Sequence, residues 1–247
     1  MNNIEIIKKE FYRIKSLGFV KSTRPNNTDG DIGNTFEDYL GVKENNHKKA
    51  DFMGFEVKSR REFTSSYMSL FTKSPTSPKG ANRFLKDTFG RGDSMFPELK
   101  SLHTSIFAHR WNSVYDMYKM KLHIDDVNDE LVLQIADKNE KIISENVNWT
   151  YASLQKAMNK MKNLFVVSAQ VKKQEGETYY FFDKATCYFG LNFERFISVL
   201  SNGNIMFDIR IGVYKSGKNI GKPHDHGSGF RIKPEKISEF YNNEIIL

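Results

Sequence analysis

An apolar stripe runs along the first residues of the chain. Its members recur at three- and four-residue intervals, the repeat of one helix face, and are Ile4, Ile7, Phe11, Ile14 and Leu17. Gly18 follows them as a helix stop, so the spacing predicts a helix that packs on the core. The same kind of spacing predicts helices in the segments TFEDYLG, TYASLQKAMNKMKN and LNFERFISVLSNG.

Alternating apolar and polar residues predict strands elsewhere. GFEVKSR and SYMSLFTKS are predicted strands, MYKMKLHI, ELVLQIAD and KIISENV form a predicted meander, and LFVVSAQVKK and TYYFFDKATCYF form a predicted hairpin. The clearest strand is NIMFDIRIGVY, in which Phe207, Ile209 and Ile211 face one side and Asp208 and Arg210 the other. Hairpins mixed with scattered helices indicate an α+β fold.

Three stretches interrupt this pattern. STRPNNTDGDIGN is a polar loop, and the prolines and glycine of SPTSPKGANRFL predict another loop. Residues 87–113 are the least regular part of the chain. No repeat, linker or break in composition marks a domain boundary, so we expect residues 1–247 to form a single unit.

Composition narrows the class of protein. With 39% hydrophobic and 13% aromatic residues, the chain is not disordered, and no apolar run approaches the roughly 18 residues of a membrane span. The single cysteine, Cys187, excludes an intrachain disulfide and a four-cysteine zinc site, which favours a reducing, cytoplasmic location. The net charge of +7 suggests a polyanionic partner without establishing one.

The strongest candidate catalytic residues lie in the stretch DFMGFEVK. In a strand, Glu56 and Lys58 share one side, and Asp51 lies just upstream with Gly54 allowing a tight turn. Two converging carboxylates repel each other unless a divalent cation joins them, and Mg²⁺ prefers such oxygen ligands. A lysine on the same side can orient or help deprotonate the attacking water. This D-x4-E-x-K arrangement is the core of the PD-(D/E)XK nucleases.

The motif has little specificity alone, because Asp93, Glu98 and Lys100 have the same spacing. Pro97 argues against a strand there, and the neighbouring glycines argue for a loop. For either copy, the alternative interpretation is a solvated edge strand that carries a charged pair. A further carboxylate, Glu37, lies on the predicted helix before the first copy and could reach the outer shell of a metal, or be an ordinary exposed acid.

A second polar region begins at residue 212. Three lysines, Lys215, Lys218 and Lys222, alternate with glycines in a loop suited to phosphate contacts. The His-Asp-His stretch and arginine that follow, with two residues of the preceding strand, could hydrogen-bond base edges. These residues are His224, Asp225, His226, Arg231, Asp208 and Arg210. A zinc site at the two histidines lacks a third ligand, and a surface salt-bridge network is the other alternative.

Four blocks together resemble one family. GNTFEDYLG, ADFMGFEVKS, LFTKSPTSPKGAN and DIRIGVYKSGKNIGKPHDHGSGFRI are similar in order and spacing to the restriction endonucleases of the MvaI/BcnI group, relatives of the mismatch-repair nicking enzyme MutH. The resemblance runs from about residue 30 to the end, although residues 87–120 match poorly and suggest a divergent loop. The family motif has proline where this chain has Ala50, and that proline ligates nothing.

The resemblance implies a PD-(D/E)XK core with a mixed β-sheet flanked by helices, in two lobes around a DNA cleft. A catalytic lobe would centre on residues 30–75 and a recognition lobe on residues 205–232. Asp51 and Glu56 would hold Mg²⁺, Lys58 would act on the water, and Glu37 would be the accessory acid. Lys73 would lie near the cleaved phosphate. The recognition cleft would contain Asp208, Arg210, His224, Asp225, His226 and Arg231.

The implied activity is that of a type II restriction endonuclease acting as a monomer on double-stranded DNA. It would cut short CC/GG-flanked pseudo-palindromic sites one strand at a time, leaving 5′-phosphate and 3′-hydroxyl ends. We expect Mn²⁺ to replace Mg²⁺, Ca²⁺ to support binding without cleavage, and a cognate DNA methyltransferase to be the functional partner in a prokaryotic cytoplasm. The alternatives are a MutH-like repair nickase and a DNA-binding module whose triad is inert.

Overall fold

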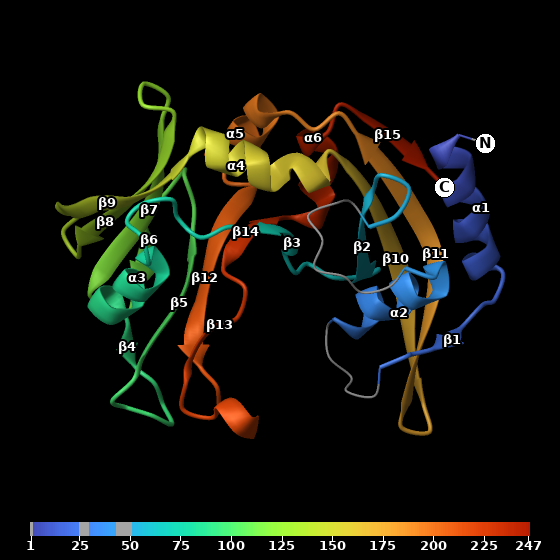
Figure 1. The fold of residues 1–247 in the computed structure, drawn as a ribbon, viewed down its shortest axis with the longest axis horizontal. Coiled ribbons are helices and arrows are strands. Elements are labelled where there is room, and N and C mark those ends of the chain that lie inside the picture. Colours follow the sequence, from blue (N-terminus) through green and yellow to red (C-terminus); the bar gives the residue numbers. More distant parts are fainter. Residues whose placement is uncertain (1, 25–29, 43–50) are drawn as a thin grey trace. The chain divides into compact units, whose positions relative to one another are not determined.

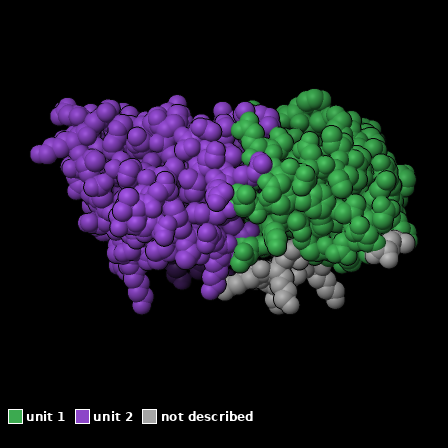
Figure 2. Space-filling model, turned by 90° about the horizontal axis from the view of Figure 1, so that it is seen from above, with its two compact units in different colours: residues 1–66, 159–192, 237–247 green, residues 67–158, 193–236 purple. Residues whose placement is uncertain are grey.

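The computed structural model describes residues 2–24, 30–42 and 51–247. Two predicted segments lie partly outside the described residues. They are the polar loop, at residues 25–29, and the expected catalytic lobe, at residues 43–50, which include Ala50. The chain forms two compact units, which Figure 2 shows in different colours. Unit 1 comprises residues 1–66, 159–192 and 237–247, and unit 2 comprises residues 67–158 and 193–236. Residues 67–75, which we assigned to the catalytic lobe, therefore belong to unit 2.

Unit 1 is built on a mixed β-sheet with helices beside it (Figure 1). Its elements are α1 (Asn3–Lys15), β1 (Val20–Lys21), α2 (Asp31–Leu40), β2 (Glu56–Arg61), a 3-10 helix (Asn159–Met161), β10 (Asn163–Gln174), β11 (Glu177–Phe189), α6 (Ile237–Phe240) and β15 (Asn243–Ile246). The strand order is β1-β11-β10-β2, with β15 also paired to β11. Strands β2 and β10 are parallel, and the other pairs are antiparallel.

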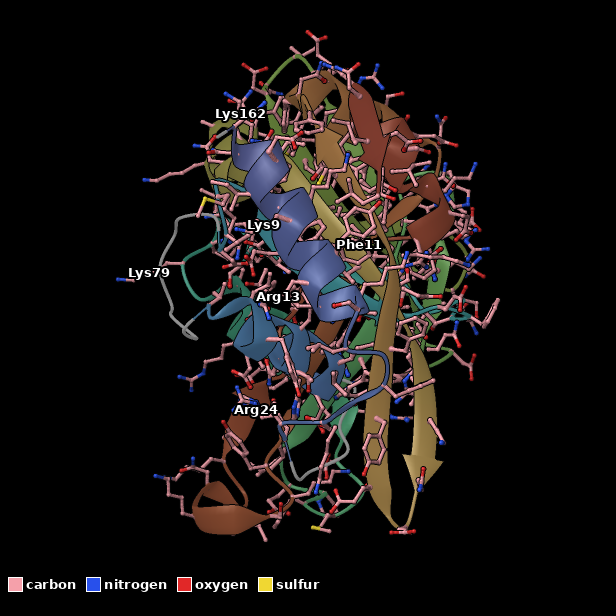
Figure 3. The ribbon with its side chains drawn as sticks, turned by 90° about the vertical axis from the view of Figure 1, so that its right-hand side faces the viewer. Lys9, Phe11, Arg13, Arg24, Lys79 and Lys162 are labelled. Atoms are coloured by element: carbon pink, nitrogen blue, oxygen red, sulfur yellow. The ribbon has the colours of Figure 1, made fainter. Side chains whose placement is uncertain are left out.

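The core of unit 1 lies between this sheet and the two N-terminal helices. Phe11 of α1 and Phe36 of α2 are fully buried, and both rings meet Phe165 of β10 edge-on (Figure 3 labels Phe11). Arg13, at the end of α1 beside α2 in Figure 3, donates to the Tyr39 carbonyl at 2.6 Å. Ile7, Phe11 and Ile14 therefore pack on the core as predicted, with Ile4 partly buried beside them, but the helix ends at Lys15 and Leu17 is 50% exposed beyond it.

Unit 2 contains two sheets. Its elements are β3 (Met68–Thr72), α3 (Ala81–Phe89), β4 (Arg91–Gly92), β5 (Lys100–Ile106), β6 (Asn112–Val114), β7 (Tyr118–Asp125), β8 (Glu130–Asp137), β9 (Ile142–Thr150), α4 (Tyr151–Met158), α5 (Phe193–Ser201), β12 (Ile205–Val213), β13 (Pro223–Asp225) and β14 (Gly229–Ile232), with 3-10 helices at Gly217–Asn219 and Pro234–Lys236. One sheet has the order β3-β14-β12-β5-β4, with β13 paired to β12. The other is the predicted meander, β6-β7-β8-β9. Trp149 of β9 is fully buried against Phe207 of β12 and Phe230 of β14, and these aromatic contacts join the two sheets.

Two segments that were predicted as loops contain regular secondary structure. The segment predicted as a loop contains α3, because its prolines precede the helix and do not interrupt it: the Pro78 carbonyl accepts from Ala81 N–H, and Gly80 takes a positive φ of 79° at the N-cap. The region 87–120 is not a divergent loop either, since it holds β4, β5, β6 and the start of β7. Strand β5 pairs with β12, the middle strand of the sheet.

No helix among the described residues is long and apolar enough to cross a membrane.

Candidate active site and recognition surface

The predicted carboxylate–lysine group forms on β2 of unit 1. Phe55 and Val57 point into the core, and Glu56 and Lys58 point to the other side of the strand, as the alternation predicted. Asp51 lies upstream of the strand, and its carboxylate accepts a hydrogen bond from the Val57 backbone N–H at 3.1 Å. A tight turn with positive φ at Met53 and Gly54 brings the chain back so that Phe52 and Phe55 exchange backbone hydrogen bonds.

Glu56 is the most enclosed charge of the site. Its residue is 1% exposed, and its Oε1 accepts from the Lys58 ammonium at 2.7 Å. Lys160 contributes a second ammonium, 2.8 Å from the same oxygen. The other oxygen, Oε2, is buried and has no hydrogen-bond partner among the described residues.

The two carboxyl groups have opposite pKa shifts. Burial, together with the nearby Glu56 carboxylate, raises the pKa of Asp51. Burial also disfavours the charged form of Glu56, but the ammonium groups of Lys58 and Lys160 outweigh it and lower the pKa of Glu56. Two carboxylates that approach each other, one of them with an unpartnered buried oxygen, form a donor set that suits a hard divalent cation.

This donor set is incomplete on its own. Among residues 2–24, 30–42 and 51–247, no group of three or more His, Cys, Asp or Glu side chains is placed to hold a metal ion. That geometry fits Mg²⁺, which keeps several waters and binds through one or two carboxylates plus a phosphate. It gives no support to the zinc alternative at His224 and His226.

Lys160 was missed by the sequence reasoning. It lies in the 3-10 helix just before β10, about a hundred residues after Glu56 in the chain. The parallel pairing of β10 with β2, in which Leu164 is the register partner of Glu56, brings the two segments together. No local spacing connects Lys160 to the motif, so the sequence alone carried no signal for it.

Glu37 is half-buried on α2, a helix that contacts β2. Phe36 and Leu40 are buried as predicted. The accessory role of Glu37 stays a prediction. The second copy of the motif is not a site of the same kind: Asp93 accepts from Met95 N–H and from the Ser101 hydroxyl, which makes it an organiser of the turn before β5.

Four of the six predicted recognition residues, Asp208, Arg210, His224 and Arg231, gather on one side of β12 in unit 2, whereas Asp225 is the register partner of Ile211 and His226 follows β13. We call this side the polar face of β12. Directly opposite residues of antiparallel strands point to the same side of a sheet, so the strand registers define its members. The polar face consists of Asp208, Arg210 and Gly212 on β12, Ser105 and His103 on β5, His224 on β13, and Arg231 on β14.

Several of these side chains hold one another in place. The Arg231 guanidinium forms an ion pair with Asp208 at 2.8 Å and donates to the Ser69 hydroxyl at 2.6 Å. Asp208 also accepts from the Ser105 hydroxyl at 3.2 Å. Arg210 is farther from Asp208, at 3.9 Å, and its side chain is 47% exposed. The arrangement leaves Arg210 more accessible than the pair that flanks it.

The His-Asp-His stretch divides into two roles. The ring of His224 stacks on Tyr214 with centroids 4.0 Å apart, and His226 meets His224 edge-on. Burial, with electrostatic interactions from His224, His103 and Arg210, lowers the pKa of His226 and so favours its neutral ring, which offers one donor and one acceptor. Asp225 accepts from Gly227 N–H, Ser228 N–H and Asn82, which makes it a support of the loop.

The remaining candidates lie at the edges of this surface. Lys215 is near Ser94 and Asp93, and Lys218 and Lys222 are exposed. Lys73 lines a surface pocket of unit 2 together with Ser74, Asp225 and Gly227. Lys73 thus belongs to unit 2, whereas the carboxylate–lysine group belongs to unit 1, and its place beside a cleaved phosphate stays a prediction.

The chain is similar to known proteins over nearly its whole length. The model of the MvaI/BcnI restriction endonuclease family matches residues 8–241. The restriction endonuclease MvaI in complex with its cognate DNA substrate is 33% identical, with a TM-score of 0.91 over 100% of this chain and 98% of that one. MvaI in the absence of DNA is 30% identical, with a TM-score of 0.63 and the same coverage. The search of curated proteins found no match. The chain therefore belongs to the MvaI/BcnI family of restriction endonucleases and is a type II site-specific deoxyribonuclease.

Proposed function

We propose that the enzyme hydrolyses double-stranded DNA in a Mg²⁺-dependent reaction at a short CC/GG-flanked pseudo-palindromic site. It cuts one strand at a time and leaves 5′-phosphate and 3′-hydroxyl ends. The observation that carries this proposal is the buried, unpartnered Oε2 of Glu56 beside Asp51, with the Lys58 ammonium on the opposite oxygen. The DNA complex of the similar MvaI enzyme supports duplex DNA as the substrate.

Asp51 and Glu56 would hold the metal, and Glu37 would act as an accessory acid near it. When bound, Mg²⁺ supplies charge neutralisation at the phosphate and lowers the pKa of a bound water. Lys58 keeps Glu56 Oε1 in place at 2.7 Å, and its partly exposed ammonium can donate to the attacking water or to a phosphate oxygen. Because Lys160 shares that oxygen, Glu56 stays ionised while Lys58 exchanges partners.

We assign catalysis to unit 1, with a PD-(D/E)XK core, and sequence recognition to unit 2. The polar face of β12 and the adjoining His226 carry groups that match base edges: Arg210 suits guanine, and a neutral His226 can donate or accept. Lys215, Lys218 and Lys222 would contact phosphates, which position the duplex without reading it. Lys73 would act near the cleaved phosphate.

Incubation with plasmid DNA and Mg²⁺ tests the proposal. We expect discrete fragments, Mn²⁺ in place of Mg²⁺ to allow cutting, and Ca²⁺ to allow binding alone. Asp51→Ala should abolish cleavage and preserve binding, whereas Asp93→Ala, in the second copy of the motif, should still show Mg²⁺-dependent cleavage. A product that stops at open circles would identify a nickase, and sequence-specific binding without Mg²⁺-dependent cleavage would identify a binding module.

The proposal extends to assembly and partners. We expect the enzyme to be a monomer in size-exclusion chromatography, with and without DNA. A DNA methyltransferase that modifies the same sequence should protect a plasmid from cleavage. Cutting of fully methylated sites at the unmodified rate would contradict this pairing.

A further inference from the structure

Strand β5 adds side chains to the polar face of β12 that the established family activity does not by itself assign. His103 is the register partner of Arg210, so both project from the same side of the sheet. Its neighbours in β5, Leu102 and Ile106, point into the core. His103 is exposed, whereas Ser105 on the same side is tied to Asp208.

The position of His103 is set by rigid parts of unit 2. Its backbone N–H donates to the Tyr115 hydroxyl at 2.9 Å, and that hydroxyl donates to the Ser101 carbonyl at 3.2 Å. Arg91 lies over the Tyr115 ring at 4.5 Å, so the ring has a contact as well as the hydroxyl. A side chain on a strand whose backbone is held in this way is placed more precisely than one on a loop.

The imidazole of His103 meets that of His226 above Gly212. The ring centroids are 6.4 Å apart. A Cβ atom on Gly212 would lie 3.1 Å from Nε2 of His103 and 3.3 Å from Nε2 of His226. The two Nε2 atoms therefore converge on one point of the polar face, where the absence of a side chain on Gly212 lets both rings approach the strand.

We propose that His103 is a specificity-determining residue that contacts a base edge in the major groove, paired with His226 over Gly212. An imidazole nitrogen donates when it carries a proton and accepts when it does not, so two converging rings can match the adjacent groups that a purine presents there, N7 with O6 or N6. His103 also borders a pocket lined by Arg91, Asp93 and Lys215, in which two cations against one carboxylate leave a positive charge that suits the neighbouring phosphate backbone. This inference rests on the proposed sequence-specific recognition of duplex DNA by unit 2.

The test combines His103→Ala with chemical changes to the DNA. After the cleavage site of the unmodified enzyme has been mapped, a set of duplexes carries a 7-deazapurine, which lacks the N7 acceptor, at one purine at a time. Binding in Ca²⁺ and cleavage in Mg²⁺ are measured for both proteins. We expect His103→Ala to weaken cognate binding and kcat/KM by about ten- to a hundredfold, and one 7-deaza duplex to cause no further loss in that variant.

Two controls separate this role from a structural one. His123→Ala removes an exposed histidine from β7 of the same unit and should change neither readout. His103→Asn, which keeps a donor and an acceptor, should recover part of the lost discrimination, and both His103 variants should unfold at the temperature of the unmodified protein. A lost preference for the cognate sequence with unchanged thermal stability supports the proposal.

Unchanged discrimination in His103→Ala, or full additivity with every 7-deaza duplex, would overturn the inference and leave the proposed function intact. If the unmodified enzyme neither cuts nor selects any duplex, the proposed function fails first, and the inference fails with it.

Discussion

Replacing Lys160 with methionine tests whether this lysine neutralises the buried Glu56 carboxylate. Glu56 is 1% exposed, and its Oε1 has two ammonium partners, Lys58 at 2.7 Å and Lys160 at 2.8 Å. Removing the sole partner of a buried charge costs about 3–5 kcal/mol. The cost is smaller here because Lys58 remains and because the Lys160 side chain is 34% exposed. A hydrogen bond to a charged group contributes about 1.5–3 kcal/mol, so we expect a loss of about 1–3 kcal/mol.

The assay is urea unfolding in metal-free buffer, followed by fluorescence and circular dichroism together. Lys160→Met is measured in the natural sequence and in the Glu56→Gln background. We expect the loss of unfolding free energy to fall below about 0.5 kcal/mol when Glu56 carries no charge, which gives a coupling of at least about 0.5 kcal/mol. Lys162→Met, at an exposed neighbouring position labelled in Figure 3, is the matched control and should have no effect in either background.

An equal loss in both backgrounds would refute the reasoning, because Lys160 would then stabilise the chain through its stem and not through its charge. A stability gain in Lys160→Met would refute it as well, since it would mean that desolvation of the ammonium costs more than the ion pair returns.

The structure supports three further predictions. Because the pKa of Asp51 is raised in the folded state, ionising this carboxyl costs stability, and the cost grows as the pH rises through the folded-state pKa. Asp51→Asn should therefore raise the melting temperature at pH 8 without metal. This gain should disappear below pH 4. A lower melting temperature at pH 8 would contradict this. Burial raises the pKa of the Cys187 thiol to about 12, so a disulfide reagent at pH 8 should react only as fast as the protein opens, and a rapid burst would disagree. Lys218→Gln should reduce the slope of log binding constant against log salt by about one, with Lys162→Gln unchanged, and equal slopes would remove Lys218 from the phosphate contacts.

The local part of the candidate active site could be predicted from the sequence, because a strand places alternate residues on opposite sides. Phe55 and Val57 identified the core side of β2, which fixed the side of Glu56 and Lys58. Lys160 could not be predicted in this way. Its contact with Glu56 depends on the parallel register between β2 and β10, a long-range pairing that no spacing along the chain encodes.

The errors in the fold have a related cause. Strand β5 alternates Ser101, His103 and Ser105 with Leu102, Thr104 and Ile106, but the glycines and the proline just before it favoured the interpretation as a loop. Gly90 and Gly92 are instead demanded by close backbone approach, since a Cβ atom on either would lie within 2.8 Å of a carbonyl oxygen. A glycine can thus indicate either a loop or a close approach between backbone segments, and only tertiary contacts distinguish the two.

The order in which the segments of unit 1 are synthesised has a consequence for when activity can arise. Parallel strands need a crossover connection, and between β2 and β10 this connection contains residues 67–158, the first and larger segment of unit 2. The chain passes between the units four times, after residues 66, 158, 192 and 236, so no single truncation releases either unit intact. A ribosome must therefore add Lys160 and β10 before the carboxylates of residues 51 and 56 acquire their surroundings. A chain that stops before residue 160 carries the nuclease motif of residues 51–58 without the lysine and the strand that surround its carboxylates in the folded unit.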